Sequence, residues 1–291
     1  MQQLKLIPVK DAGTIDKVFD IDCVADVDAR QCYIDSALAR DLPRVVNRPR
    51  RPGKVAIVGS GPSVTDCVEI LQNFDGEIWG INRSFEWMRH RGIKPTGFVG
   101  IDPEWFLLEA LPEPPTDVTY YLASQVHPQV FDHLKDRNVR LWFMADGQVK
   151  QPADACLIYG GSTCLGRAPN LAYALGYREV HIFGGDSSYT HKTHVHGGEL
   201  PENWVPVELN GVVYKTNRMM LSQACEFSDQ MVEWAKGKDP LEVTLYGDGL
   251  MQALYAHQMQ IGTYQNYLRE EFAAGAGLNR KQRRAMKRRA A

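Results

Sequence analysis

Residues 55–63 read VAIVGSGPS, a short apolar run that closes on two glycines. The residues that follow, VTDCVEILQNF at 64–74, carry Val64, Val68 and Leu71 at helical spacing. A buried strand, a glycine turn and a helix in this order are the opening unit of an α/β domain. We therefore expect a parallel sheet that begins at residue 55.

The same unit repeats along the chain. Further strands are predicted over 77–84, 95–103, 118–124, 139–145, 155–160, 178–186 and 243–249. Helices are predicted over 85–92, 104–111, 128–136, 165–177 and 219–237, with a closing helix after the last strand. Because strands alternate with helices, we expect a doubly wound, mainly parallel, Rossmann-like sheet covered on both faces.

The alternation of predicted strands and helices is interrupted after Asp186. Residues 187–216 are polar and contain Asn210-Gly211 between two apolar runs, which predicts a hairpin. An insertion at the carboxyl end of a strand is expected to act as a substrate lid.

Composition and patterning divide the chain into three parts. Residues 1–50 show weak periodicity and end in a stretch rich in arginine and proline, so we interpret them as an N-terminal extension with a linker. Residues 51–270 form the Rossmann-like domain, and 271–291 form a basic tail. Its last stretch, 279–291, carries seven of the 33 basic residues, so the remainder of the chain has 26 basic against 35 acidic residues. Nucleic acid or an acidic partner is a candidate for the tail, and a solvated terminal helix is the alternative.

Composition excludes several classes of protein. The chain has 291 residues and is 44% hydrophobic and 23% charged, values typical of a globular protein rather than a disordered or disulfide-stapled one. Its six cysteines form no C-x-x-C pair, so we expect reduced thiols and no zinc finger. We find no apolar run of 18 residues, and we expect a cytoplasmic protein that does not enter a membrane.

Three strands are followed by residues suited to bind a ligand, and the carboxyl ends of parallel strands are where ligands bind in such sheets. The first loop offers glycine amides and a helix N-terminus to a phosphate, or it is a structural turn. Its residues are Gly59, Ser60, Gly61, Pro62 and Ser63. The second offers Asn82, for a nucleoside or as a helix cap. The third offers Asp102, for a hydroxyl or Mg²⁺ or as a helix cap.

Two further loops add polar groups. Asp186 ends the strand 178–186, and three histidines, at 191, 194 and 196, follow it. They are candidates for proton transfer or phosphate contact, because their spacing does not fit a zinc site. Gly161, Ser162 and Thr163 precede the helix over 165–177 and offer amides to a ligand, or Ser162 and Thr163 cap that helix.

In order and spacing, these motifs resemble the 6-hydroxymethylpterin diphosphokinase MptE-like family. The resemblance rests on VAIVGSGPS, on GINRSFEWMRHRGIKPTGFVGIDP at 80–103 and on the stretch from Gly160 to Gly198, and covers roughly residues 54–198. That family is related to motility accessory factors and, more distantly, to sialyltransferase-like proteins.

The resemblance implies a nucleotide-binding transferase domain. In its pterin enzymes the diphosphate of ATP passes to a hydroxymethyl group with Mg²⁺, whereas the sialyltransferase-like relatives use a CMP-sugar and no metal. The implied phosphate site is Gly59, Gly61, Pro62 and Ser63, with Asn82 at the nucleoside. Asp102 and Asp186 would hold the metal or the acceptor, and His194 matches the histidine that follows the G-x-D motif.

The sequence departs from the family pattern at Ser187-Ser188, where relatives often have leucine and a small residue. We therefore predict a transferase that moves diphosphate from ATP to a hydroxymethyl-type acceptor, with Asp186, His194 and Asp102 catalytic and Asp102 and Asp186 on Mg²⁺. The alternatives are a glycosyltransferase that takes a CMP-sugar to a small-molecule or glycan acceptor, with His194 as base, and a nucleotide-binding adaptor without turnover.

Overall fold

The computed structural model describes residues 26–145, 147–190, 194–195, 197, 204–209, 211–236 and 239–261. Eight strands form one parallel sheet in the order β10-β7-β1-β2-β3-β4-β5-β6. Their bounds are β1 Val55–Val58, β2 Glu77–Ile81, β3 Gly97–Gly100, β4 Thr119–Ala123, β5 Asn138–Met144, β6 Leu157–Ile158, β7 Glu179–Phe183 and β10 Glu242–Leu245. The predicted doubly wound, parallel, Rossmann-like fold is confirmed.

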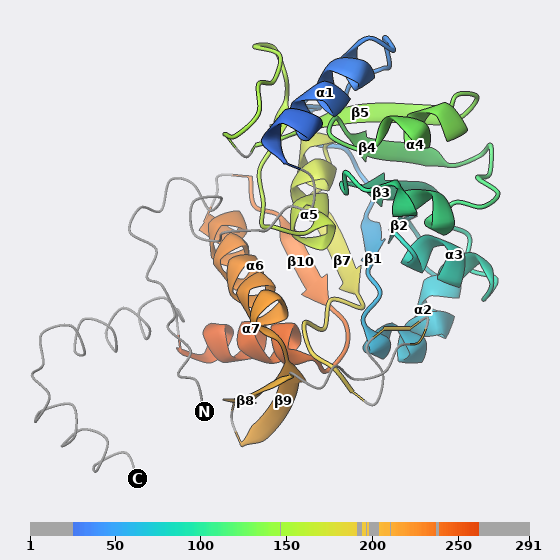
Figure 1. Cartoon of the computed structure of the whole chain (residues 1–291). Coiled ribbons are helices and arrows are strands. Elements are labelled where there is room, and N and C mark those ends of the chain that lie inside the picture. The colour runs from blue at the N-terminus through green and yellow to red at the C-terminus, as the bar shows by residue number, and fades with distance from the viewer. Residues whose placement is uncertain are drawn as a thin grey trace, which may run out of the picture.

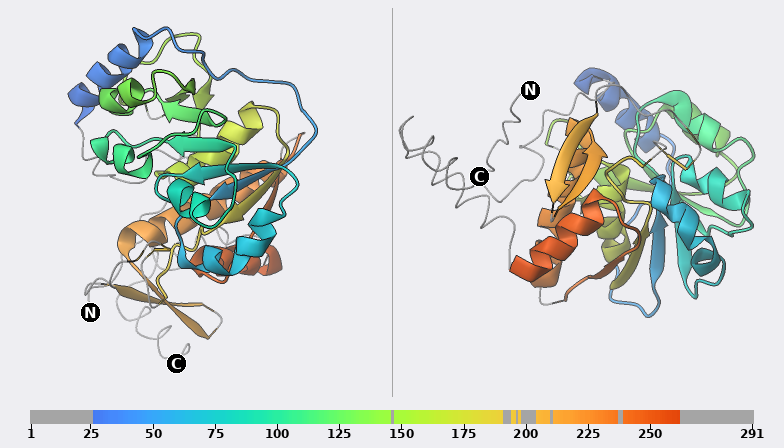
Figure 2. Two further views of the ribbon diagram at one scale, coloured as in Figure 1. Left: turned by 90° about the vertical axis from the view of Figure 1, so that its right-hand side faces the viewer. Right: turned by 90° about the horizontal axis from the view of Figure 1, so that it is seen from below.

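Helices cover both faces of the sheet (Figures 1 and 2). One face carries α2 (Val68–Gln72), α3 (Ser84–Arg89) and α4 (Pro128–His133), and the other carries α5 (Cys164–Ala174), α6 (Arg218–Lys236) and α7 (Leu250–Ile261). Side chains of β1 alternate between the two layers: Ile57 packs in the core that contains α5, and Val58 in the core beside α3. Alternation with burial on both faces explains why β1 is apolar throughout.

The strand order reverses at β1. The chain runs from β1 through β6 in one direction, and α5 then returns it to β7, on the other side of β1. From β1 the chain continues towards β2, and from β7 towards β10, so the connections diverge to opposite sides of this point, where open α/β sheets commonly bind their ligands. The candidate site therefore lies at the carboxyl ends of β7, β1, β2 and β3.

Two predicted helices are 3₁₀ helices instead. η2 (Pro62–Cys67) occupies the first half of the helix predicted over 64–74, and η3 (Trp105–Ala110) replaces the one predicted over 104–111. In η2 the Thr65 hydroxyl donates to the Pro62 carbonyl at 2.8 Å, and the Ser63 amide is drawn to the Asp186 carboxylate. Local hydroxyl bonds of this kind compete with the α-helical pattern.

Residues 26–50 contain structure that the sequence did not predict. The helix α1 (Val27–Leu38) begins at Asp26, whose carboxylate accepts from the Ala29 amide at 2.7 Å. The chain then bonds to Leu141 of β5 through Val45, at 2.7 Å between N and O, and to Ala174 through Arg48. The stretch interpreted as a linker thus runs along the domain and is bonded to it. Its arginine and proline content hid this, because backbone groups make the contacts.

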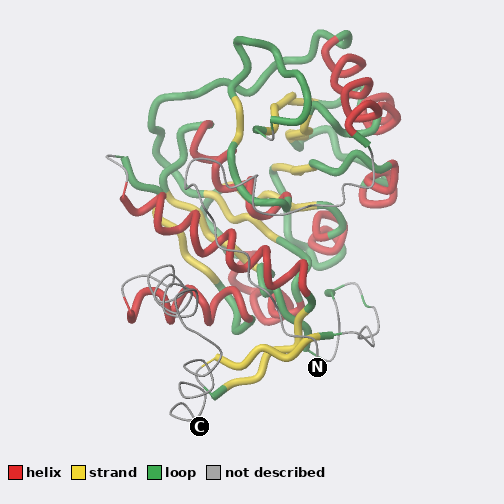
Figure 3. The backbone as a smooth tube through the Cα atoms, turned by 60° about the vertical axis from the view of Figure 1, so that its left-hand side comes forward, coloured by secondary structure: helices red, strands yellow, loops and turns green. Residues whose placement is uncertain are grey.

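The predicted hairpin is present as β8 (Val205–Leu209) and β9 (Val212–Thr216), an antiparallel pair outside the main sheet. Figure 3 shows it beyond α7, at the end of the molecule opposite α1. Within the described ranges, no helix is long and apolar enough to cross a membrane. Residues 1–25 and the basic tail at 271–291 lie outside the described residues, so the partner expected for the tail stays a prediction.

Candidate functional site

The glycine loop after β1 is packed directly against the loop after β7. Amides of Gly59 and Gly61 donate to the carbonyls of Phe183 and Gly184, each at 2.8 Å. A Cβ atom at either Gly59 or Gly61 would lie 2.6 Å from the Gly184 carbonyl oxygen, so neither position admits a side chain. Gly184 itself has a φ of +64°. The glycines therefore serve close approach of two backbones, one of the roles that glycine performs in such turns.

Asp186 anchors the start of η2. Its Oδ2 accepts from the Ser63 amide at 2.8 Å, and its Oδ1 accepts from the Ser63 hydroxyl at 2.5 Å. The side-chain amide of Gln252 on α7 also donates to Oδ1, at 3.3 Å. Asp186 is 3% exposed. Burial raises the pKa of this carboxyl, and the hydrogen bonds from Ser63 oppose that shift.

The C-terminal part of the domain closes over the same aspartate. Backbone atoms of Asp186 accept from the Met251 amide at 3.1 Å, and the Ser188 hydroxyl accepts from the Leu250 amide at 3.1 Å. A Cβ atom on Gly249 would lie 2.5 Å from the Asp186 carbonyl oxygen. Ser188, which departs from the family pattern, therefore caps the start of α7.

Asp102 and Asp186 are the residues that would hold the predicted Mg²⁺. Mg²⁺ needs oxygen ligands that can approach it together in octahedral geometry. Both oxygens of Asp186 already accept hydrogen bonds in a dry environment, and the described residues contain no group of three potential metal ligands. As the described residues are placed, the predicted pair of aspartates does not fit a magnesium site, and a role of Asp186 in the reaction stays a prediction.

The loop before α5 also binds a carboxylate from its own chain. Glu226 of α6 is 4% exposed, and its Oε2 accepts from the Ser162 amide at 2.7 Å and the Ser162 hydroxyl at 2.9 Å. Thr163 caps α5, since its hydroxyl accepts from the Gly166 amide at 3.0 Å. A Cβ on Gly161 would lie 2.3 Å from the same Glu226 oxygen. Of the two roles predicted for this loop, helix capping is the one that Thr163 has in the structure.

Sequence reasoning missed Glu226. Its signal was a polar pair, Glu226 and Gln230, spaced four residues apart on the helix face that also carries the buried Phe227 and Met231. A carboxylate next to buried apolar positions requires donors inside the protein. The helix N-terminus at Ser162 supplies them.

Asn82 and Asp102 follow the neighbouring strands β2 and β3. Asn82 has a φ of +50°, and its Oδ1 is buried without a hydrogen-bond partner among the described residues. Asp102 is half-buried, and its Oδ1 accepts from the Glu104 amide at 3.2 Å. Burial raises the pKa of Asp102. Neither residue caps a helix through its side chain, so the ligand-binding alternative stays a prediction for both.

His194 lies beside the glycine loop. The next residue, Val195, donates its amide to the Ser60 carbonyl at 3.0 Å and packs in the core beside α3. Burial lowers the pKa of His194, and the positive charge of Arg83 lowers it further. Arg83, which directly follows Asn82, is a second residue that sequence reasoning missed. The histidines at 191 and 196 lie outside the described residues.

The carboxyl edge thus has two parts. Asp186 and Glu226 satisfy the donors of Ser63 and Ser162 on one side. On the other side, Ser60, Asn82 and Asp102 end the strands β1, β2 and β3, with His194 near Arg83. An amide oxygen, a carboxyl group and an imidazole at one edge can bind a nucleoside and exchange a proton with a hydroxyl.

Comparison with solved structures shows the same fold. The structure of the MAf glycosyltransferase from Magnetospirillum magneticum AMB-1 superposes with a TM-score of 0.60 and 18% identity. The match covers 83% of this chain and 39% of that one, so the chain spans well under half the length of that relative. No curated protein sequence matches the chain.

Two sialyltransferase structures are more distant. CstII from Campylobacter jejuni, in complex with cytidine-5'-monophosphate as a substrate analogue, gives a TM-score of 0.30 and 14% identity over 49% of this chain and 65% of that one. A mammalian sialyltransferase in complex with Gal-beta-1-3GalNAc-ortho-nitrophenol gives a TM-score of 0.35 and 11% identity over 80% of this chain and 89% of that one.

At the level of sequence, the profile of one family matches residues 34–192, from within α1 to the segment after β7. The match covers the glycine loop, Asn82, Asp102, the loop before α5 and Asp186, and it begins earlier than the resemblance seen in the motifs alone. The chain belongs to the 6-hydroxymethylpterin diphosphokinase MptE-like family.

Proposed function

We propose that this protein transfers a group from a nucleotide-activated donor to a hydroxyl group of an acceptor, with His194 as the general base. The observation that carries the proposal is the position of His194, next to the glycine loop through the Val195–Ser60 hydrogen bond and close to Arg83. Family membership and the likeness to a glycosyltransferase fold support a transferase.

A base must be unprotonated at the working pH. Burial and Arg83 both lower the pKa of His194, so its imidazole is neutral at pH 7 and able to accept a proton. In the proposed step the acceptor O–H bond breaks and its proton passes to the imidazole. The acceptor oxygen forms a new bond to the transferred group, and the bond between that group and the nucleotide breaks, with its electron pair leaving on the nucleotide phosphate.

The donor is expected to lie along the ends of β1 and β2. Asn82 Oδ1 is a buried acceptor without a partner among the described residues, and an amino or hydroxyl group of a nucleoside would satisfy it. The amides of Gly59 and Gly61 are already bonded to the loop after β7, so the donor's phosphate is expected to contact the loop at Ser60 rather than at the two glycines.

A sugar is the transferred group that the site supports best. A nucleotide-sugar reaction with a histidine base needs no metal, and Asp186 is engaged by Ser63 and Gln252 rather than placed to bind one. Transfer of diphosphate from ATP is the second candidate. It is favoured by the description of the family and by Asp102, a half-buried carboxyl at the end of β3 beside Asn82's strand.

Metal dependence separates the two candidates. The thermal unfolding midpoint of the full chain would be measured with ATP, GTP, CTP, CMP and a CMP-sugar, each with EDTA and with Mg²⁺. A ligand at a hundred times its Kd adds about 2.7 kcal/mol of stability. A shift with CMP or its sugar in EDTA supports sugar transfer, whereas a shift with ATP only in Mg²⁺ supports diphosphate transfer. The absence of any shift contradicts both candidates, whereas a shift without turnover supports the nucleotide-binding adaptor.

His194 can be tested through its titration as well as through turnover. We expect His194→Asn to reduce donor turnover by about 10²- to 10⁴-fold, the usual contribution of a general base. Because the Arg83 charge lowers the pKa of His194, Arg83→Gln should raise that pKa, and the acidic limb of the rate profile should move to higher pH.

The imidazole proton signals of His194 report the same shift by NMR without substrate. Arg140→Gln, which removes an exposed arginine on β5, is the matched control and should leave the titration unchanged. An unaltered His194 titration in Arg83→Gln would refute the electrostatic argument.

A further inference from the structure

A cavity of about 570 Å³ opens beside the proposed site, between α3, η3 and Val195. Its lining residues are Arg83, Glu86, Trp87, His90, Arg91 and Glu109, together with Ala110 and Val195. The volume lies within the range of small-molecule sites, about 300–1,000 Å³. Val195 connects the cavity to the glycine loop, and Arg83 connects it to His194.

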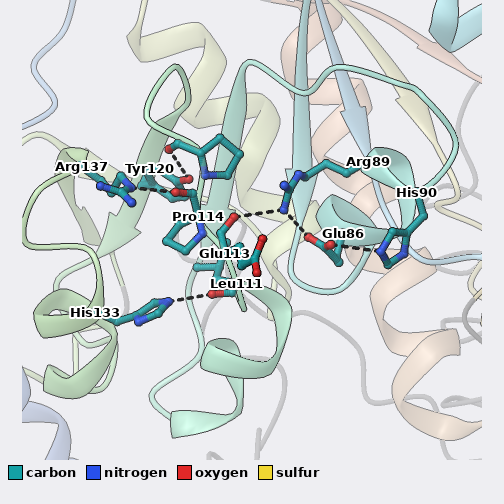
Figure 4. A network of polar contacts seen from close by, with 10 residues as sticks. Glu86, Arg89, His90, Leu111, Glu113, Pro114, Tyr120, His133 and Arg137 are labelled. Atoms are coloured by element: carbon teal, nitrogen blue, oxygen red, sulfur yellow. Dashed lines mark hydrogen bonds and ion pairs between the residues drawn. The ribbon is translucent and has the colours of Figure 1, made fainter.

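The wall on the η3 side is fixed by hydrogen bonds from α3, from α4 and from the segment just before β5. Arg89 of α3 donates to the Glu113 carbonyl at 3.1 Å, and Arg137 donates to the Pro114 carbonyl at 2.7 Å. His133 is bonded to the Leu111 carbonyl at 2.7 Å (Figure 4). Because these bonds hold the backbone that follows η3, the cavity is part of the rigid domain rather than of a loose loop.

Internal pairs use most of the charges around the cavity. Arg83 forms an ion pair with Glu109. Figure 4 shows Glu86 between Arg89, at 2.7 Å, and His90, at 3.3 Å. Arg91 has no carboxylate partner among the described residues; its guanidinium lies over the Trp87 ring, 4.3 Å from the centroid. Arg83 is thus paired with Glu109, and Glu86 is paired with Arg89 from outside the lining, so the positive charge of Arg91 is not offset by a carboxylate among the described residues.

The tryptophan beneath Arg91 is part of the built wall. Trp87 is 5% exposed, and its Nε1 is buried without a hydrogen-bond partner among the described residues. A guanidinium stacked on an indole is held flat, which presents its N–H groups in a fixed fork to an oxyanion. An arginine in this state suits a carboxylate or a phosphate better than a lysine would.

We propose that this cavity binds the acceptor of the transfer reaction and that the acceptor is a hydroxylated molecule carrying one anionic group, a carboxylate or a phosphate, held by Arg91. That the bound molecule is the acceptor rests on the proposed function. Binding of a hydroxylated anion at Arg91 does not depend on it. Arg83 borders both the cavity and His194, so an acceptor anchored at Arg91 presents its hydroxyl groups towards the base.

The test uses the full chain without nucleotide. Glucuronate, glucose 6-phosphate and glucose would be titrated separately, and the indole N–H signal of Trp87 would be followed by ¹H–¹⁵N NMR. We expect the two anionic sugars to move that signal and glucose to move it far less. The stronger of the two anions identifies the anionic group as carboxylate or phosphate.

Variants of Arg91 decide the role of the charge. Arg91→Gln should weaken binding of the anionic sugar by about 10-fold or more, the usual effect of losing a hydrogen bond to a charged group. Arg91→Lys, which keeps the charge but loses the fork, should weaken it less. Arg140→Gln, an exposed arginine on β5 away from the lining residues, should have no effect.

Several results would overturn the inference. Equal responses to glucose and glucuronate, an unmoved Trp87 signal with all three sugars, or full binding by Arg91→Gln would each do so. These outcomes are distinct from failure of the proposed function. Anion binding at Trp87 without donor turnover would support the anion site in the cavity and contradict the proposed transferase. Transfer to neutral acceptors by Arg91→Gln would support the transferase and contradict the anion site.

Discussion

The two sides of the carboxyl edge differ in how their polar groups are satisfied. On the β7 and α5 side, the Asp186 and Glu226 carboxylates accept from the amide and hydroxyl of Ser63 and Ser162. On the β2 and β3 side, Asn82 Oδ1 has no partner among the described residues. A glycine-rich loop before a helix is therefore not enough to predict a phosphate site, because a buried acidic residue elsewhere in the chain can satisfy the same donors.

Removal of the Asp186 side chain is expected to have the largest effect on stability. Asp186→Ala leaves the amide and hydroxyl of Ser63 buried without an acceptor, at a cost of about 1–3 kcal/mol for each group. We expect the free energy of unfolding to fall by about 3 kcal/mol or more, measured by urea denaturation. Asp66→Ala, an exposed acidic residue in η2, should change it by less than about 0.5 kcal/mol. Equal effects of the two variants would rule out the anchoring role.

The same anchor predicts a pH dependence. Burial raises the pKa of Asp186, so the folded protein holds that proton to a higher pH than the unfolded chain does. The part of its contribution to stability that depends on protonation is complete below the ordinary pKa of aspartic acid and is lost as the pH rises through the raised pKa. The stability difference between wild type and Asp186→Asn should therefore shrink from acidic to neutral pH. A difference that grows over this range would contradict the direction of the shift.

Removal of the Glu226 side chain is expected to have the next largest effect on stability. Glu226→Ala removes the acceptor for the amide and hydroxyl of Ser162, which are half-buried, so we expect a loss of about 2 kcal/mol in denaturation experiments. It also opens the N-terminus of α5. Inorganic phosphate should then raise the unfolding midpoint of Glu226→Ala but not of the control Glu208→Ala, an exposed position on β8. No phosphate response would mean that α5 offers no latent anion site.

The smallest effect is expected at Asn82, where two substitutions separate backbone from side chain. Its φ of +50° costs an alanine about 1–2 kcal/mol and costs a glycine nothing. Asn82→Gly should keep the stability of the wild type and lose nucleotide binding, whereas Asn82→Ala should lose both. Thermal unfolding with and without nucleotide measures the two effects together. Undiminished nucleotide binding by Asn82→Gly would exclude the side chain from the site.

Local pattern was sufficient to predict the sheet. The apolar runs around Val55–Val58 and Glu179–Phe183 ended in glycines, and the structure places strands there. Asn210-Gly211 likewise predicted the pair β8 and β9. The helix α1 escaped prediction because its buried Arg30 interrupts the apolar face. That arginine donates to Gln125 at 3.3 Å and to Gln148 at 2.5 Å, and both partners lie about a hundred residues away in sequence.

The sequence was sufficient to predict where the candidate site lies, but not which of its polar groups already have hydrogen-bond partners. Strand ends identified Ser63, Asn82 and Asp186, which do lie at the carboxyl edge. What sequence could not give is which donors are already satisfied, since Asp186 is 123 residues from Ser63 and Glu226 is 64 residues from Ser162. The first pair follows from the contact of the loops after β1 and β7, and the second from the packing of α6 beside the start of α5, and both depend on the tertiary structure.

The contacts of α7 with Asp186 bear on where this domain can be cut. The profile of the family ends at residue 192, yet β10 pairs with β7, α6 covers α5, and Gln252 reaches the aspartate from α7. A fragment that stopped at 192 would expose the apolar face of α5 and leave β7 as an unprotected sheet edge, a combination that favours aggregation. We therefore expect the segment that matches the family to need β10, α6 and α7 for its stability.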